Sequence, residues 1–191
     1  MGMLGLGLTA AGHDEEALSV QEAELIMLRR LGASEETMLA VQSNLANTYC
    51  ELGRSDEALS AYREAYARCK SLFGNSDERT LMAANNLVFQ LQKQNKYTEA
   101  VSILREPLLD ARRALGDDHD MTLMLGSLLA DSLAGPGTSP TVGNLREAIA
   151  LQEDICKRSR RLLGRSHPYT QIRQRALDEA KHYVAHHFPE G

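Results

Sequence analysis

Tryptophan is absent from this chain, and six tyrosines and three phenylalanines make up only 5% of its 191 residues. Scarce aromatic and β-branched runs argue against a β-sandwich or barrel, because such folds are built from those residues. The sequence also lacks an apolar stretch of about 18 residues, the length that a membrane-spanning helix needs. Lysine and arginine are not in surplus, since 21 basic and 26 acidic residues give a net charge of −5. We therefore expect neither a membrane protein nor one that coats nucleic acid by bulk charge.

Cysteines are few as well. The three residues are Cys50, Cys69 and Cys156, an odd number, and no two of them have metal-ligand spacing. This pattern predicts buried, reduced thiols in a cytoplasmic protein. The remaining composition, with 43% apolar and 25% charged residues, is typical of a globular protein. The length suits one domain or a short repeat array.

Internal repeats dominate the sequence, and three independent series of residues carry them. A Leu-Gly or Phe-Gly step recurs with spacings of 42, 42 and 48 residues, at positions 31–32, 73–74, 115–116 and 163–164. Alanine follows glutamate with nearly the same period, at Ala17, Ala58, Ala100 and Ala148. Threonine follows each glycine turn, at Thr37, Thr80, Thr122 and Thr170. A common period in several series is the signature of a repeat architecture.

The longer third interval has a visible cause. Residues 134–144 contain three glycines and two prolines, which indicates a loop. An insertion of six residues there turns an interval of 42 into the observed 48. Surface loops tolerate such insertions at small entropic cost.

Each repeat contains two helical patterns. Apolar residues at helical spacing, interrupted by glycine, predict helices at about 37–52, 55–73, 78–94, 97–115, 120–134, 144–163 and 168–188. Three histidines, His13, His119 and His167, fall in the turns, where their side chains can cap the helix that follows.

The residues within a repeat resemble a known family. Leu45-Ala46-x-x-Tyr49-x-x-x-Gly53-x-x-x-x-Ala58 resembles the tetratricopeptide repeat pattern. The 42-residue period, the turn at 163–170 and the segments Asn44-Leu45-Ala46 and Asn85-Asn86-Leu87 resemble the longer repeats of kinesin light chains. The resemblance implies an all-α fold, an α-solenoid in which antiparallel helix pairs stack into a right-handed superhelix.

The same frame predicts the organisation of the domain. We expect a single repeat domain over 1–191, with full repeats at 34–73, 77–115 and 119–163 and a C-terminal capping helix at 168–188. Residues 1–31 would be a partial first repeat, because Leu4-Gly5, Gly12 and Ala17 fit the frame of Leu45-Ala46, Gly53 and Ala58. Either the chain is a fragment of a longer protein, or its apolar N-terminal edge pairs with another chain and allows oligomers.

In the family, first helices line a concave groove that binds a peptide, which implies a non-catalytic protein–protein interaction module without cofactors. The positions that correspond to the groove are Ser43, Asn44, Asn47, Met82, Asn85, Asn86, Phe89, Lys93, Ser127 and Asp131. Asparagine amides can hold a peptide backbone, and Phe89 with the methionines can form an adaptable apolar pocket. Asn44 and Asn86 can equally serve as spacers between repeats, and Phe89 and Met82 as core. A clamp for two carboxylates is not expected, because Lys93 is the one cation among these positions.

Charge is distributed unevenly. Residues 1–37 carry seven acids and two bases, whereas 157–175 carries seven bases and no acid. The basic run is typical of solvated helix ends, favoured by the helix dipole. It also suits a docking patch for an acidic segment, or head-to-tail self-association of acidic and basic ends. Such self-association, through the charged ends or the N-terminal edge, makes a structural scaffold the alternative function. Nucleic acid is disfavoured, since Tyr169 is the one aromatic residue in the run.

An enzyme would need converging polar groups. The best candidates are Asp178, His182 and His186, which share one face of the last helix, with His187 beside them. Two histidines four residues apart can bind zinc. A terminal helix hardly forms a closed cavity, however, so we expect no metal site and no enzymatic activity.

Overall fold

The computed structural model describes residues 14–135 and 141–188. Within these ranges the chain forms eight α-helices and no strand, which confirms the all-α class. The contacts between residues divide the chain into two units, 1–74 and 75–191, which are described separately below. The boundary coincides with the Phe73-Gly74 turn between two of the expected repeats. The expected helix of the partial first repeat before Ala17 lies largely in 1–13, outside the described residues, and the single domain over 1–191 stays a prediction.

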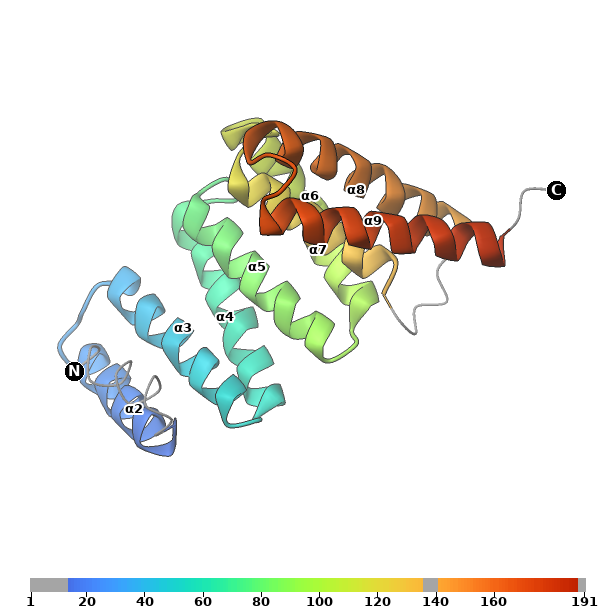
Figure 1. The fold of residues 1–191 in the computed structure, drawn as a ribbon. Coiled ribbons are helices and arrows are strands. Elements are labelled where there is room, and N and C mark those ends of the chain that lie inside the picture. Colours follow the sequence, from blue (N-terminus) through green and yellow to red (C-terminus); the bar gives the residue numbers. More distant parts are fainter. Residues whose placement is uncertain (1–13, 136–140, 189–191) are drawn as a thin grey trace. The chain divides into compact units, whose positions relative to one another are not determined.

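Unit 1 contains α2 (Asp14–Arg30), α3 (Glu35–Glu51) and α4 (Ser55–Phe73). Helix α3 packs against both α2 and α4 (Figure 1). The core between α2 and α3 is built from Leu18, Leu25, Val41 and Leu45. A buried hydrogen bond also joins these helices, since the Thr48 hydroxyl donates to Gln21 Oε1 at 2.9 Å.

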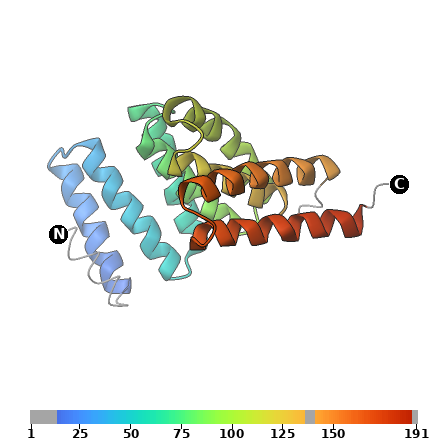
Figure 2. The same cartoon turned by 45° about the horizontal axis from the view of Figure 1, so that its top comes forward.

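Unit 2 contains α5 (Glu78–Lys93), α6 (Tyr97–Leu115), α7 (Asp120–Leu133), α8 (Val142–Leu162) and α9 (Pro168–His187). Helix α7 is central, because it packs against α5, α6 and α8, while α9 packs against α8 (Figure 2). The core consists mostly of leucines contributed by successive helices; among the most fully buried are Leu81, Leu87, Leu91, Leu104, Leu125, Leu133 and Leu145. This is the layered packing of stacked helix pairs.

The expected helices begin and end within two residues of those observed. Glycine explains why the ends are so well marked. Gly116 and Gly164 follow the ends of α6 and α8 with φ of 89° and 88°. Residues with a side chain rarely adopt this conformation, so each helix ends where the repeat places its glycine.

Two histidines cap helices as expected. His119 Nδ1 accepts a hydrogen bond from the backbone N–H of Met121 at 3.3 Å, and His167 Nδ1 accepts one from Tyr169 at 3.2 Å. Each ring thereby satisfies an N–H that has no partner within its own helix. His13, the third histidine expected to cap, lies outside the described residues.

The four threonines that follow the glycine turns do not all have the same surroundings. Thr80, Thr122 and Thr170 are buried at equivalent positions, but Thr37 is exposed and its hydroxyl hydrogen-bonds Ser34 at 2.8 Å. The turn after Gly32 is one residue shorter than those after Gly74 and its equivalents. Met38, rather than Thr37, therefore occupies the position of Thr80.

The cysteines largely follow expectation. Cys69 and Cys156 are buried, Cys50 is half-buried, and all three are free thiols. Burial raises the pKa of the Cys156 thiol. Among the described residues, no helix combines the length and the apolar character that crossing a bilayer requires.

Candidate functional site

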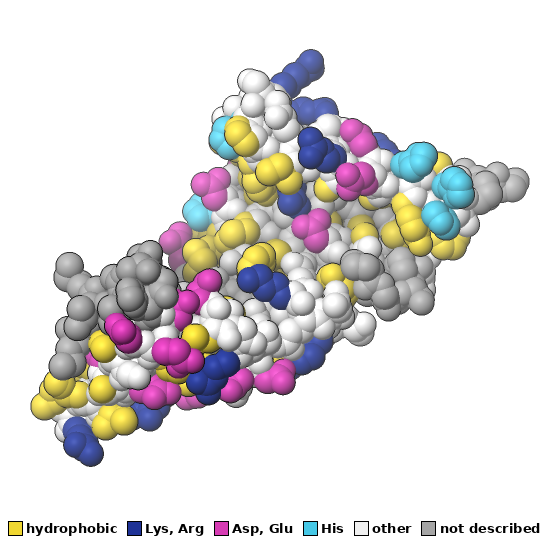
Figure 3. All heavy atoms as spheres, turned by 60° about the horizontal axis from the view of Figure 1, so that its bottom comes forward, with side chains coloured by type: hydrophobic (Ala, Val, Ile, Leu, Met, Phe, Trp, Pro, Cys, Tyr) yellow, Lys and Arg dark blue, Asp and Glu magenta, His cyan; other side chains and the backbone are white. Residues whose placement is uncertain are grey.

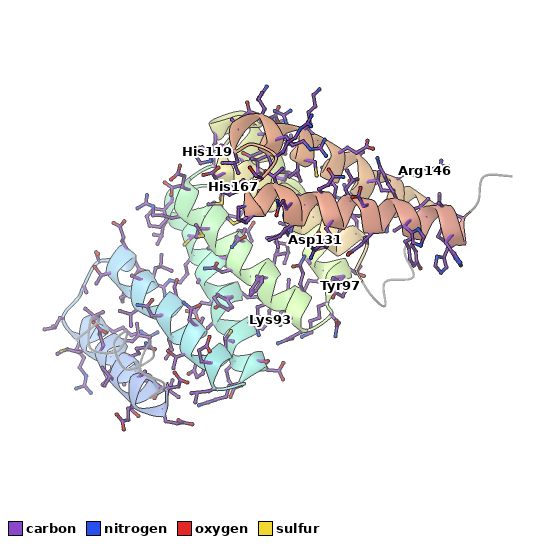
Figure 4. All side chains as sticks on the ribbon, viewed as in Figure 1. Lys93, Tyr97, His119, Asp131, Arg146 and His167 are labelled. Carbon is purple, nitrogen blue, oxygen red and sulfur yellow. The ribbon has the colours of Figure 1, made fainter. Side chains whose placement is uncertain are left out.

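Helix α5 presents the most open part of the expected binding face. Met82 and Phe89 are 44% and 52% exposed, although both side chains are large and apolar. The ammonium of Lys93 lies 5.0 Å from the centre of the Phe89 ring, a distance at which a cation is attracted to the ring face. Figure 4 labels Lys93 at the C-terminal end of α5. These three residues form a small apolar surface with one positive charge, which we call the α5 surface.

The two asparagines of α5 are half-buried and bond to each other. Asn85 Nδ2 donates to Asn86 Oδ1 at 3.3 Å. Within the described part of the chain, neither amide forms a hydrogen bond with a residue of another helix. No such bond therefore supports a role of Asn86 as a spacer between repeats. The remaining donor and acceptor groups of the pair are available for a peptide backbone.

Helix α7 uses its expected site residues for packing. Ser127 is buried, and its hydroxyl lies 2.8 Å from the carbonyl oxygen of Leu123 and 2.9 Å from the Tyr169 hydroxyl of α9. Asp131, labelled in Figure 4, accepts hydrogen bonds at 3.0 Å from Gln152 Nε2 of α8 and from Arg173 Nη1 of α9. Both side chains therefore join neighbouring helices of unit 2. Ser127 is thereby removed from the surface, whereas the Asp131 side chain keeps 39% exposure but has both carboxylate oxygens engaged.

In unit 1, the expected residues lie on α3. Ser43 and Asn44 are half-buried, and Asn47 is exposed. The Oδ1 atom of Asn47 accepts a hydrogen bond at 2.5 Å from the hydroxyl of Tyr62 on α4. Burial is the main cause that raises the pKa of Tyr62, with the neighbouring Cys50 as the second cause. The Asn44 side chain bonds no described residue, so its amide remains open to a ligand.

Ile172, which is 55% exposed on α9, was not among the predicted site residues. The repeat register could have found it. Met82, Met124 and Ile172 are separated by 42 and 48 residues, the same intervals as the glycine turns. They therefore occupy equivalent positions on α5, α7 and α9, where Met124 is half-buried. The three apolar residues thus form a row across α5, α7 and α9 of unit 2.

The start of α5 is fixed electrostatically. Asp77 is the N-cap, and its Oδ1 accepts a hydrogen bond from the backbone N–H of Arg79 at 2.9 Å. The Arg79 side chain also donates to both carboxylate oxygens of Asp77. These bonds lower the pKa of Asp77 to about 2. The carboxylate thus stays ionised at the positive end of the helix that carries the α5 surface.

The histidines at the end of α9 do not assemble a metal centre. The rings of His182 and His186 have their centroids 6.4 Å apart, while the His187 ring stacks on Tyr183. Figure 3 shows histidine side chains gathered on one surface near the end of the chain. No group of three histidine, cysteine or carboxylate side chains within 14–135 and 141–188 is placed to hold a metal ion.

Comparisons with known proteins agree on the fold. Two sequence models described as tetratricopeptide repeat match residues 37–106 and 141–169, together more than half of the chain. No curated protein sequence matches the chain significantly. Among solved structures, the putative kinesin light chain of Podosopora anserina with nearly identical TPR-like repeats superposes with a TM-score of 0.79 at 21% identity, covering 97% of this chain and 86% of that one.

Two further structures are similar. A substituted form of the same Podosopora anserina protein gives a TM-score of 0.81 at 20% identity, with 97% of this chain and 85% of that chain covered. BtubC (BKLC) from P. vanneervenii gives 0.76 at 19% identity, with 94% and 70% covered. At such low identity these similarities establish the fold, an α-solenoid of stacked helix pairs.

Proposed function

Because this chain belongs to the tetratricopeptide repeat family, we propose that it is a non-catalytic module that binds a peptide segment of a partner protein on the first helices of its repeats. The observation that carries the proposal is the exposure of Phe89 and Met82 beside Lys93 on α5. Phe89 is one of three phenylalanines in the chain. Half-exposed aromatic side chains are typical anchors of binding energy once a partner covers them.

The α5 surface suits a segment with a large apolar side chain. That side chain would pack on Phe89 and Met82, while the Asn85–Asn86 pair would hold the peptide backbone. In unit 1, the open amide of Asn44, with Ser43 and Asn47, would hold a peptide in the same way. Such contacts involve no bond-making chemistry, no cofactor and no nucleic acid. The free thiols support a cytoplasmic location.

Peptide-display selection tests the proposal. We expect a shared motif to be enriched by the wild type and lost with the Phe89→Ser variant. Leu109→Ser is the matched control, because Leu109 on α6 is also half-exposed and apolar. Enrichment of the same motif by wild type and Phe89→Ser would contradict the α5 site. No enrichment by the folded wild type would contradict peptide binding itself.

Self-association is a second candidate, favoured by one observation in unit 1. Ile26, Met27 and Leu31 are all exposed at the C-terminal end of α2. Together they make an apolar surface that a second chain could cover. Light scattering across a range of concentrations tests this candidate. A mass that rises with concentration and falls for Met27→Ser would support it, and a constant monomer mass would contradict it.

A further inference from the structure

The outer face of α9 differs from the same face of α7. In α7 this face is formed by four buried residues, Leu123, Gly126, Ala130 and Leu133. The equivalent positions 48 residues later are Gln171, Gln174, Asp178 and Lys181, of which Gln174 is half-buried and the others exposed. An apolar packing face has thus become polar, as is typical of the last element of a repeat array.

Beside this face, the arginines of the basic run fall into two groups. Three of them form ion pairs within the described residues. Arg158 binds Asp118 and Asp154, Arg161 binds Asp118, and Arg173 binds Asp131. These guanidinium groups hold the turn before α7 against α8 and hold α9 against α7. Their positive charges are therefore paired with carboxylates of unit 2.

Arg160, Arg165 and Arg175 form the second group. None of them has an ion pair with any residue that the structure describes, and all three line the same hollow, whose volume is about 560 Å³. The hollow lies between the end of α8 and the polar face of α9. Arg160 hydrogen-bonds the side-chain oxygen of Gln174, and Gln174 Nε2 donates to Asp178 Oδ1 at 2.7 Å. Gln174 therefore bridges Arg160 to Asp178, and the hollow has an acidic end one helical turn beyond Gln174 and Arg175, at Asp178 and Glu179.

We propose that this hollow binds an acidic segment of a partner protein, with the carboxylates of that segment paired to Arg165 and Arg175. Guanidinium groups are suited to bidentate hydrogen bonds with carboxylates. The acidic end of the hollow disfavours a compact, multiply charged anion such as phosphate, because Asp178 and Glu179 would repel it. An extended peptide can place two or three carboxylates at the arginines while the rest of its chain leaves the hollow away from Asp178 and Glu179. This surface is separate from α5, so its failure would leave the proposal for Phe89 intact.

Fluorescence anisotropy with labelled hexaglutamate at low salt tests the inference. We expect binding by the wild type that weakens as salt is added, since exposed charge pairs are screened. The Arg165→Gln/Arg175→Gln variant should bind about fivefold or more weakly, because each exposed ion pair contributes modestly. The matched control is Arg105→Gln/Arg161→Gln, which removes the same charge from two arginines that are already ion-paired. Circular dichroism shows whether each variant is folded.

Three outcomes would overturn the proposal. One is equal affinity of the wild type and the Arg165→Gln/Arg175→Gln variant for hexaglutamate. Another is displacement of hexaglutamate by equimolar inorganic phosphate, which would make the hollow a phosphate site instead. The third is self-association of the wild type that the Arg165→Gln/Arg175→Gln variant lacks, which would make a second copy the occupant.

Discussion

Asp131 on α7 and Arg173 on α9 form an ion pair in which Oδ2 and Nη1 are 3.0 Å apart. The Arg173 side chain is only 16% exposed, and Asp131 also binds Gln152 of α8. One carboxylate thus ties three successive helices together. Because the Arg173 side chain is mostly shielded from water, its attraction to Asp131 is screened less than that of an exposed ion pair.

Arg173→Gln should lower the free energy of unfolding by about 1–2 kcal/mol, measured by urea denaturation. The control is Arg105→Gln, which removes an exposed partner of Glu147 and should cost less than about 0.5 kcal/mol. Equal effects of the two substitutions would contradict a tie between helices at Asp131.

Asp77 provides a prediction about pH. Its pKa is lowered to about 2 in the folded protein, below the ordinary value of about 3.9 for a free aspartate. The stabilisation from its charge is therefore present above about pH 4 and is lost as the pH falls toward 2. Asp77→Asn should be less stable than the wild type at pH 6, and the difference should shrink between pH 4 and pH 2. A difference that grows on acidification would contradict this account.

Gly126 tests the close packing of α7 on α8. A Cβ atom added there would meet Ile155 Cδ1 at 3.3 Å and Leu108 Cδ1 at 3.8 Å. Gly126→Ala should change stability by less than about 1 kcal/mol, since the gain in helix propensity offsets a small shift of the Ile155 methyl. Gly126→Leu should cost about 1–3 kcal/mol through overpacking. Thermal unfolding of both variants measures these effects. An unchanged stability of Gly126→Leu would contradict close packing of α7 against α8 at this position.

The cysteines give a chemical prediction. Cys156 is buried and its thiol pKa is raised by burial, so little thiolate forms near neutral pH. Iodoacetamide should modify Cys156 slowly in the native protein and rapidly in urea, as read by mass spectrometry. Half-buried Cys50 is the internal comparison. Rapid native labelling of Cys156 would show that the α8 face opens readily.

The helices and their order could be predicted from the sequence, because each repeat marks both the ends of its helices and their buried face. Gly116 and Gly164 mark those ends through their backbone conformation, and Leu87 and its equivalents mark the buried face. The site was harder to predict. Periodicity shows which face of α7 a residue occupies, but not what covers that face. Tyr169 and Arg173 bond Ser127 and Asp131 from 42 residues further along the chain.

Exposure and ion pairing account for the other differences between the predicted and the observed site. Ile172 was not among the predicted site residues, yet it is more exposed than Met82 at the equivalent position of α5. The arginines of 157–175 form one run in the sequence, but only pairing in three dimensions separates those that bind Asp118 and Asp131 from those that line the hollow.

The most direct test of the α5 surface is calorimetric titration of the peptide that display selection enriches. We predict that Phe89→Ser weakens its affinity about tenfold or more, as loss of an aromatic anchor does, while Leu109→Ser leaves the affinity unchanged. Equal affinities of the wild type and Phe89→Ser, with both proteins folded, would show that the peptide binds elsewhere and would contradict the central claim.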